Sequence, residues 1–289
     1  MLSPSPTAEI GAVRRARPLL GTRVEIAVSD EQWSQRQLHA AVNEAFAEVE
    51  RVHRLMSFHE VSSELSELNR DACRRPVRVH VDTFRVFEMA LNFSWLTDGA
   101  FDPTVAPILQ SWGCLPSSDV QHDPCANWCD IELLDGYRIR YRRALRVDLG
   151  GIAKGFAVDL AVCALKSRGV EDVMVNAGGD LRVAGPRRHG VRLRHPCEPV
   201  EKAYFLEIKD QALATSAPYF SRRTVSGGRQ VSALLHPANR RPELQIGSVS
   251  VLADDCTSAD ALTKAVLFAP REVAERSLAI CGAQACVIK

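Results

Sequence analysis

The chain has 289 residues, which is enough to bury a substantial core as one large domain or as two interleaved lobes. Its 36 Lys and Arg nearly balance its 35 Asp and Glu, so neither nucleic acid nor an acidic membrane surface is an expected partner. No apolar run approaches the roughly 20 residues of a membrane span, and the N-terminus lacks the apolar region of a secretory signal. We therefore expect a cytoplasmic protein without a membrane span.

In the first third of the chain, residue spacing predicts strands and two helices. Residues 22–28 alternate and are rich in branched side chains, as in a strand. Apolar residues recur every three or four positions over 32–56, which predicts a long amphipathic helix. A strand-like segment over 76–81 leads to Asp82, the expected N-cap of a helix that ends near 98–99.

The rest of the chain mixes further strands with three helices. A strand pair is expected near 137–148, followed by a helix from Ile152 to Arg168 that Gly169 closes. The stretch 171–185 predicts a buried strand, a glycine turn and a second strand. Later strands are expected near 203–208, 211–216, 230–235, 246–252 and 284–288, and helices near 257–268 and 271–281.

This order of elements favours an α+β fold with mixed sheets and flanking helices, because strands and helices do not alternate strictly. We expect a flexible segment over 1–18 and a single domain over 19–289. Nine cysteines occur at irregular spacing, and the C-x3-C pair of Cys125 and Cys129 has no second pair or histidine arrangement to complete a zinc site. Reduced thiols are the expected state in a cytoplasmic protein.

The segment VDLGGIAKGFAVD at 147–159 carries the most chemical information. A strand is expected to end at Asp148, two glycines follow, and a helix begins with Lys154 in its first turns. Exposed backbone N–H groups and the positive helix end suit a phosphate, and Lys154 adds a point charge. The Walker A and dinucleotide-binding glycine patterns are absent. On spacing alone, a phosphate site and an ordinary strand-to-helix turn are equally favoured.

Three other segments have weaker signals. Gly178 and Gly179 follow a buried strand and permit close approach by a ligand or a neighbouring backbone, although a tight hairpin in which Asp180 bonds its own turn explains them equally well. Phe101 and Asp102 could hold a planar heterocycle, although a lone Phe is more often part of the core.

The third segment, SADALTK at 258–264, begins a late helix. Asp260 shares a helical face with Thr263 and Lys264. Carboxylate, hydroxyl and carbonyl oxygens are the ligands that a hard divalent cation prefers. In isolation, the simpler interpretation is that Asp260 complements the helix dipole.

Taken in order, these segments resemble the FAD:protein FMN transferase (ApbE-like) family over nearly the whole chain. The matching segments are LGT at 20–22, MSFH at 56–59, SEL at 63–65, LN at 68–69, FDPT at 101–104, WG at 112–113, VDLGGIAKGFAVD at 147–159, NAGGDLRVAG at 176–185, ATS at 214–216 and SADAL at 258–262. The resemblance implies a two-lobed, T-fold-related α+β architecture with FAD in a cleft. It also implies a Mg²⁺-dependent reaction that splits FAD, releases AMP and places FMN on a Thr hydroxyl of a flavoprotein subunit of a redox complex.

The resemblance also implies roles for individual residues. Asp260 and Lys154 would be catalytic, and the Gly151 carbonyl, Asp260 and Thr263 would hold the magnesium ion. Nucleotide contacts are implied for Leu20, His59, Ala100, Phe101, Asp102, Asp148, Lys154, Gly178, Gly179 and Ser216.

Two departures from the family pattern matter most, and a third segment is also varied. Lys264 stands where the family usually has a metal-binding Thr, and a protonated amine has no lone pair to offer. Thr263 compensates only if the helix register shifts; alternatively, Lys264 takes part of the cation's place and contacts phosphate. The segment ALLHPANRRP at 233–242 replaces a usual H-I-I-D-P-x-T-G-x-P, and Ser216-Ala-Pro-Tyr219 varies a usual Ser-Gly-x-Tyr.

These departures leave three alternatives to FMN transfer. Hydrolysis of FAD to FMN and AMP would result if water replaced the threonine. A degenerate flavin-binding protein would bind FAD without chemistry. An interaction module for the maturation of redox enzymes would keep only a vestigial cleft.

Overall fold

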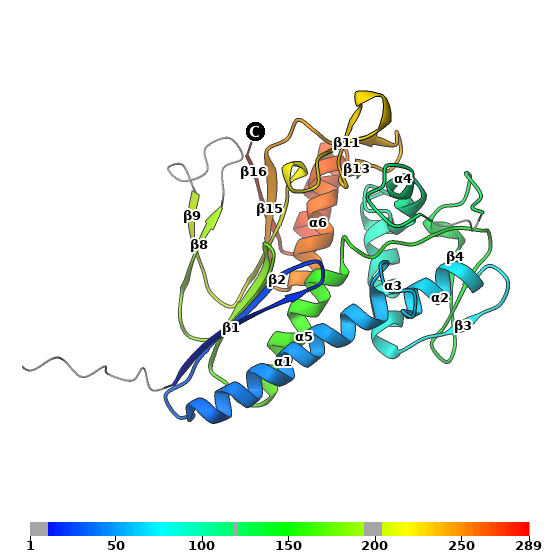
Figure 1. Ribbon diagram of the computed structural model, residues 1–289. Coiled ribbons are helices and arrows are strands. Elements are labelled where there is room, and N and C mark those ends of the chain that lie inside the picture. Colours follow the sequence, from blue (N-terminus) through cyan, green and yellow to red (C-terminus); the bar gives the residue numbers. More distant parts are fainter. Residues whose placement is uncertain (1–10, 118–120, 194–203, 289) are drawn as a thin grey trace, which may run out of the picture.

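The computed structural model describes residues 11–117, 121–193 and 204–288. Its largest element is a seven-stranded sheet in which all neighbouring strands are antiparallel. Figure 1 shows this sheet in the left half of the molecule. In spatial order its strands are β1 (Ala12–Leu19), β2 (Thr22–Ser29), β6 (Asp172–Ala177), β7 (Asp180–Ala184), β10 (Ala212–Ser216), β15 (Ser248–Ala253) and β16 (Gln284–Ile288).

Three helices cover one face of this sheet: α1 (Gln35–Met56), α5 (Ala153–Ser167) and α6 (Cys256–Phe268) (Figure 1). The alternation in β2 places Val24, Ile26 and Val28 on the buried face. The apolar stripe of α1 meets the same core, because residues three or four positions apart lie on one side of a helix. The ribbon of β8 (His189–Leu193) and β9 (Tyr204–Ile208) contributes to a second apolar cluster with β7 and β10.

A smaller lobe lies beside the sheet and its helices, on the right in Figure 1. It contains a three-stranded sheet and three helices. Their bounds are β3 (Val77–Arg78), β4 (Ile131–Leu134), β5 (Arg138–Tyr141), α2 (Glu64–Asp71), α3 (Val81–Leu96) and α4 (Ala106–Ser111). A third apolar cluster joins α4 to β12 (Gln230–Val231) and β13 (Leu235–His236), and so brings this segment to the smaller lobe.

The remaining elements are short or close the chain. Two two-stranded ribbons follow β10, and α7 (Arg271–Ile280) packs on α6. The ribbon strands are β11 (Arg223–Thr224), β12 (Gln230–Val231), β13 (Leu235–His236) and β14 (Arg241–Pro242), and the 3₁₀ turns are η1 (Pro103–Val105), η2 (Trp128–Asp130), η3 (Pro218–Phe220) and η4 (Ser226–Gly228). None of the helices in the described ranges is both long and apolar enough to cross a membrane.

The expected flexible segment over 1–18 is wrong for its second half. Residues 12–19 form β1, which pairs with β2 along its whole length. Val13 of this strand is buried in the core, and polar contacts also hold the strand, since Arg17 lies 2.8 Å from the Glu50 carboxylate of α1. Arg14, Arg15 and Arg17 interrupt the apolar alternation by which a strand is recognised in a sequence. Residues 1–10 lie outside the described part of the chain.

Other boundaries also differ from the expectation. Asp82 is not the N-cap of α3: the helix begins at Val81 with His80 as its cap, and the Asp82 carboxylate pairs with Arg51 of α1. The expected strand near 230–235 is divided into β12 and β13, which belong to different ribbons. Only two residues of 76–81 form a strand.

Candidate functional site

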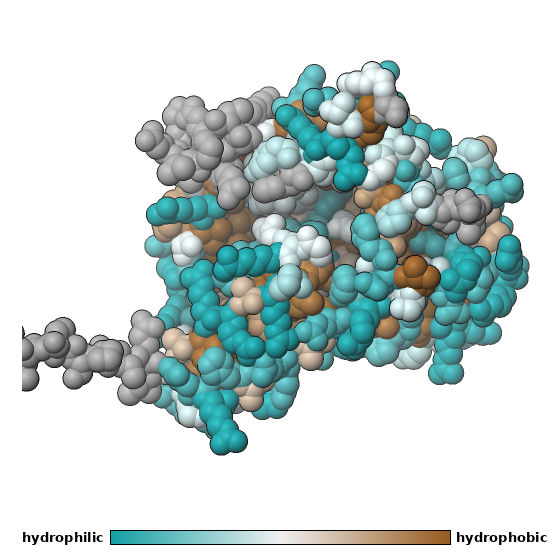
Figure 2. Space-filling view, viewed as in Figure 1, coloured by the Kyte–Doolittle hydropathy of each residue, from teal (hydrophilic) through white to brown (hydrophobic). Residues whose placement is uncertain are grey.

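A cavity of about 1020 Å³ opens between the large sheet, the N-terminal end of α5 and the smaller lobe. Figure 2 shows a hollow on this face of the molecule. Among the residues predicted to contact nucleotide, those that line the cavity are Ala100, Phe101, Asp102, Asp148, Lys154, Gly178, Gly179 and Ser216. The fold therefore brings together positions spread over more than 100 residues of sequence.

Two predicted contacts lie elsewhere. Leu20 lines a separate, smaller cavity of about 640 Å³ beside the β1–β2 turn. His59 lines neither of these two cavities, but it lies close enough to Asp148 to lower the pKa of that carboxyl, against the larger effect of burial, which raises it. Nucleotide contact by Leu20 and His59 therefore remains a prediction.

The turn before α5 is built around Asp148. The backbone N–H of Asp148 donates to the Pro103 carbonyl at 2.8 Å, which attaches the turn to the smaller lobe. Its carboxylate accepts from the Gly150 N–H at 3.1 Å. No side chain of the helix's own N-cap residue, Ile152, caps α5. The positive end of α5, with Lys154 in its first turn, thus lies at the edge of the cavity.

Asp260 supplies the missing cap from another helix. Its Oδ2 atom lies 3.4 Å from the Gly155 nitrogen in the first turn of α5. Asp260 belongs to α6, whose own N-cap is Asp255. The sequence interpretation that Asp260 complements a helix dipole was thus sound in its chemistry, but the helix concerned is α5.

The approach of α5 to α6 depends on Gly155. A Cβ atom at this position would lie 2.3 Å from the carbonyl oxygen of Cys256, a backbone atom that cannot move aside alone. Asp159, one turn further along α5, accepts from the N–H groups of Cys256 and Thr257 at 3.0 and 2.8 Å. The two helices are therefore joined where their N-terminal ends meet the cavity.

Gly155→Ala is expected to destabilise the protein by about 1–3 kcal/mol, because the added methyl forces α5 and α6 apart. Chemical denaturation followed by circular dichroism measures the change. Ser167→Ala, at the exposed end of α5, is the matched control and should stay within about 0.5 kcal/mol of wild type. An unchanged denaturation midpoint for Gly155→Ala would contradict the close packing described above.

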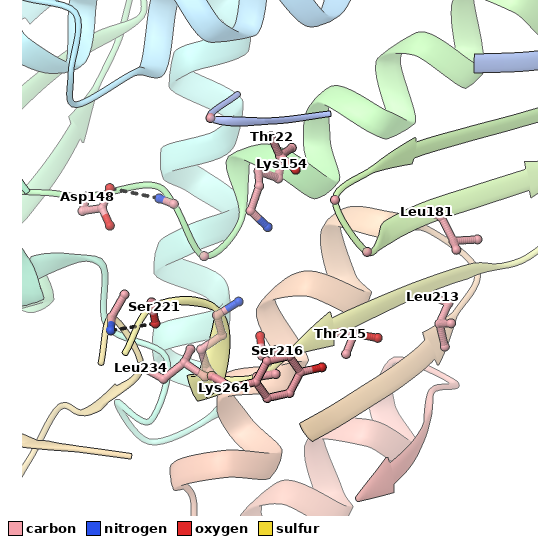
Figure 3. Close-up of a pocket in the computed structure, with 18 of the residues that line it drawn as sticks. Thr22, Asp148, Lys154, Leu181, Leu213, Thr215, Ser216, Ser221, Leu234 and Lys264 are labelled. Atoms are coloured by element: carbon pink, nitrogen blue, oxygen red, sulfur yellow. Dashed lines mark hydrogen bonds between the residues drawn. The ribbon is translucent and has the colours of Figure 1, made fainter. Parts of the chain in front are cut away.

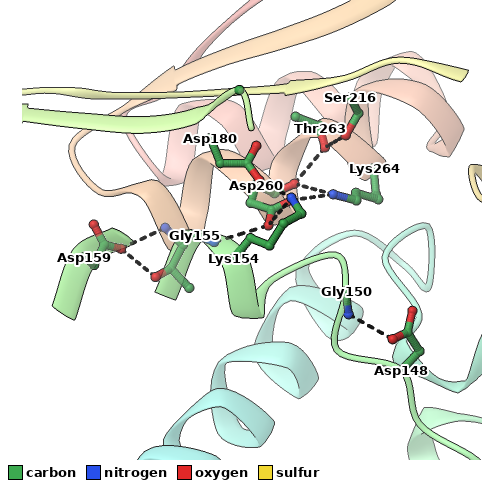
Figure 4. Close-up of polar contacts among 12 residues, drawn as sticks. Asp148, Gly150, Lys154, Gly155, Asp159, Asp180, Ser216, Asp260, Thr263 and Lys264 are labelled. Carbon is green, nitrogen blue, oxygen red and sulfur yellow. Dashed lines mark hydrogen bonds and ion pairs between the residues drawn. The ribbon is translucent and has the colours of Figure 1, made fainter. Parts of the chain in front are cut away.

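Two lysines and two aspartates form a buried charge cluster at the centre of the site (Figure 4). The Lys154 ammonium pairs with Asp180 and lies 3.7 Å from Oδ2 of Asp260. The Lys264 ammonium lies 2.5 Å from Oδ1 of Asp260 and 3.0 Å from its backbone oxygen. The Asp180 and Asp260 side chains are only 3% and 1% exposed, whereas the lysines are partly exposed. The cluster thus turns its positive groups toward the cavity.

The pKa directions in the cluster follow from this arrangement. Burial alone would lower the pKa of Lys154, but the Asp180 and Asp260 carboxylates raise it above its ordinary value. Burial alone would raise the pKa of Asp260, but Lys154 and Lys264 lower it. Lys154 and Asp260 therefore carry full charges at neutral pH.

The turn between β6 and β7 approaches the site from the sheet. The sequence left open whether Asp180 bonds its own turn; instead Asn176 accepts from the Gly179 N–H at 3.0 Å, and Asp180 pairs with Lys154. Gly178 has a φ of +69°, and a Cβ there would lie 2.2 Å from Oγ1 of Thr22. Close approach by a neighbouring strand thus explains this glycine, and the turn also lines the cavity.

Thr263 is held away from the carboxylate of Asp260. Its hydroxyl donates to the Asp260 backbone carbonyl at 2.7 Å and lies 2.7 Å from Oγ of Ser216. Since the Thr263 proton is already used, Ser216 is the donor between the two hydroxyls. Thr263 is fully buried, and no register shift brings it to the place of Lys264.

Phe101 and Asp102 both line the cavity, and Phe101 also belongs to the core, so both roles that the sequence left open are present. Phe101 is 4% exposed and packs near Phe93, with ring centroids 6.2 Å apart, yet it also lines the cavity. Asp102 accepts from the N–H and hydroxyl of Thr104 at 2.7 and 2.6 Å, and burial raises its pKa. These residues form a wall whose polar atoms are largely satisfied within the protein.

The divergent segment at 233–242 forms another wall of the cavity. Ala233 lines it, and its N–H donates to Ser221 at 3.0 Å. His236 is not part of the cavity lining and instead packs against Phe268, with ring centroids 5.6 Å apart. Arg240 has a φ of +56°, the left-handed conformation that favours glycine. Arg240 stands at the glycine of the family pattern, so an arginine here adopts a conformation that glycine takes more readily.

The predicted magnesium ligands do not fit the ion in this arrangement. Asp260 already contacts two ammonium groups, the Thr263 hydroxyl is directed to the Asp260 backbone carbonyl and Ser216, and the Lys264 side chain lies against Gly151. Within the described ranges, no group of three or more His, Cys, Asp or Glu side chains could hold a metal ion. Ligation of Mg²⁺ by Gly151, Asp260 and Thr263 remains a prediction from the resemblance.

Known proteins with similar sequences and folds agree on one family. Residues 20–287 match the model of the ApbE family. An FAD:protein FMN transferase from Vibrio cholerae is 33% identical over 235 residues, covering 76% of this chain and 70% of that protein. One from Treponema pallidum is 26% identical over 288 residues, covering 89% and 79%.

Solved structures show the same fold. The ApbE protein of Thermotoga maritima superposes with a TM-score of 0.81 at 27% identity, covering 96% of this chain and 94% of that one. The flavin transferase ApbE from Vibrio cholerae gives 0.79 at 26% identity, covering 96% and 93%. The predicted α+β fold and the family resemblance are both confirmed, and the chain belongs to the ApbE family.

Proposed function

We propose that this protein transfers FMN from FAD to a Thr hydroxyl of a partner flavoprotein and releases AMP. Family membership supports the class of reaction, since relatives from two organisms are named FAD:protein FMN transferase. The observation that carries the proposal is the pair of ammonium groups, Lys154 and Lys264, held by buried carboxylates at a cavity of about 1020 Å³.

Figure 3 shows how this pair is placed. Lys154 extends from the N-terminal turn of α5 and Lys264 from α6, and their amines point toward each other at the cavity wall, where both contact the Asp260 carboxylate. Positive charge that is fixed in advance stabilises a diphosphate without reorganisation when the ligand arrives. The N–H groups of the first turn of α5 add to the same field.

The proposed reaction forms one bond and breaks another at the same phosphorus. The acceptor hydroxyl oxygen attacks the phosphorus on the riboflavin side of FAD, and the bond from that phosphorus to the bridging oxygen breaks. The hydroxyl proton is lost to solvent or base, and AMP leaves with the bridging oxygen. Positioning and charge neutralisation dominate such a transfer. We assign them to Lys154 and Lys264, with Asp180 and Asp260 as positioning residues.

The proposed reaction does not involve a magnesium ion, because the side chains around Asp260 do not fit one. In it, Ala100, Phe101 and Asp102 form part of the flavin nucleotide pocket, together with Gly178, Gly179 and Ser216 on the sheet side. The acceptor is a subunit of a redox complex, as the resemblance implies. Cytoplasmic location stays a prediction.

One assay tests the reaction directly. The purified protein is mixed with FAD and a peptide that carries the family's Thr-containing acceptor sequence, and both AMP and peptide mass are measured. We expect AMP release together with a mass gain of one FMN. AMP without a mass gain would identify a hydrolase instead. Tight FAD binding with neither product would show a flavin-binding protein without activity, and the proposal would be wrong.

A further inference from the structure

Lys264 occupies a defined position inside the site. Its side chain leaves α6 and lies against Gly151, so that an ideal Cβ there would be 3.1 Å from Cε and 3.6 Å from Nζ. The ammonium contacts Asp260 through both the carboxylate, at 2.5 Å, and the backbone carbonyl, at 3.0 Å. The side chain is only 16% exposed. Lys264 is therefore held between the two segments that the resemblance identified as metal ligands.

From this position we infer that the Lys264 ammonium replaces a divalent cation, so that the protein binds the diphosphate of FAD without Mg²⁺. This inference rests on the proposed function for the identity of the ligand. It names a role for a residue that the family pattern does not share, and it predicts a different metal requirement.

Charge and geometry exclude Mg²⁺ while Lys264 is in place. Magnesium needs near-octahedral oxygen ligation at about 2.0–2.1 Å, and an ammonium offers no lone pair. Oδ1 of Asp260 is taken by Lys264, and Oδ2 faces Lys154 and the Gly155 N–H. An ion at this carboxylate would meet the positive charges of both lysines. The same carboxylate cannot serve Lys264 and a magnesium ion together.

The Lys264 ammonium can supply positive charge to the diphosphate of FAD in place of a magnesium ion. A lysine has three N–H donors, and Asp260 accepts two of them, which leaves one for a phosphate oxygen in the cavity. Lys154 faces the same space from α5 (Figure 3). Two lysine charges thus match the two negative charges of a diphosphate diester. Asp180 and Asp260 fix the lysines from behind, where the ligand does not reach.

Two measurements on the full-length protein test the inference. The first is Mn²⁺ binding followed by electron paramagnetic resonance, with and without FAD. The second is FAD binding followed by quenching of flavin fluorescence, in EDTA and in Mg²⁺. For wild type we expect no stoichiometric Mn²⁺ site and the same FAD affinity in both buffers. Neither measurement depends on catalysis.

Lys264→Thr restores a possible hydroxyl ligand and is expected to reverse both results. It should weaken FAD binding in EDTA by roughly 10- to 100-fold, the loss of a charge-assisted hydrogen bond. It should also gain one Mn²⁺ site and recover FAD affinity in Mg²⁺. Lys166→Thr, on α5 and outside the cavity lining, is the matched control and should resemble wild type.

A stoichiometric Mn²⁺ site in wild type, or FAD affinity that rises at least tenfold with Mg²⁺, would overturn the inference. This test does not need a folded variant. The outcomes also separate the inference from the proposed function. FAD binding in EDTA without any transfer to the acceptor peptide contradicts the function alone. Transfer that requires Mg²⁺ contradicts the inference alone.

Discussion

Replacing Lys154 by glutamine is expected to lower kcat/KM for FMN transfer by about 10²–10³-fold, the usual effect of removing one fixed group that stabilises developing charge. Lys154 is the residue of the first turn of α5 whose ammonium faces both Asp180 and Asp260. Glutamine keeps polar atoms near the same place but removes the charge that opposes the diphosphate. The acceptor-peptide assay, run over a range of FAD concentrations, gives kcat and KM separately.

The same substitution leaves Asp180 buried without its cation, which could unfold the protein and imitate a catalytic effect. The double variant Lys154→Gln with Asp180→Asn removes both charges and separates the two causes. Its melting temperature should recover toward wild type while its activity stays low. Lys166→Gln, further along α5, should leave both quantities unchanged. Near-wild-type transfer by a folded Lys154→Gln variant would show that Lys154 has no part in the reaction.

The chemical motifs could be predicted because each depends on a short stretch of sequence. In VDLGGIAKGFAVD, the glycines and Lys154 are neighbours, so the turn that faces the cavity follows from local rules. The strand expected to end at Asp148 is wrong, because β5 ends at Tyr141 and residues 142–152 form no strand. The expected bounds of α5 and α6 agree with the structure to within one residue at each end. Because the turn before α5 lines the cavity, a local sequence pattern also predicted part of the cavity wall.

The partnerships across the site could not be predicted, because they join residues far apart in the chain. Asp180 meets Lys154 only because β7 and α5 pack together, and the turn pattern of Asp180 gave no sign of this. Likewise, Asp260 caps α5 rather than α6. Both carboxylates lie in a core that only the three-dimensional packing of sheet and helices creates. The sequence around Asp180 and Asp260 indicated what chemistry each carboxylate could perform, but not which residues it pairs with.

Strand β1 was missed for a different physical reason. Its stability comes from pairing with β2 and from contacts such as Arg17 with Glu50, not from a continuous apolar face. A strand at the edge of a sheet can carry charged residues on its exposed positions. Arg240 shows the converse case: it stands at the glycine of the family pattern, and its φ of +56° is a backbone conformation that favours glycine.

Asp260→Asn is expected to reduce transfer by about 10²-fold and also to lower the melting temperature. The carboxylate balances the Lys154 and Lys264 ammonium groups and accepts from the first turn of α5. Neutralising it leaves two ammonium groups and one aspartate, so the cluster gains one positive charge in a buried place. An asparagine amide must also direct its NH₂ group toward another donor, because both carboxylate oxygens accept hydrogen bonds.

Asp255→Asn provides the matched control for this substitution on the same helix. Asp255 is the N-cap of α6 and accepts from the Ser258 N–H at 2.7 Å, and asparagine is about as good a cap as aspartate. It should therefore keep both stability and transfer. If Asp260→Asn retained wild-type transfer, the carboxylate would not be needed to fix the lysines. The positive groups at the cavity would then owe their placement to Asp180 and to the packing of α5 on α6 alone.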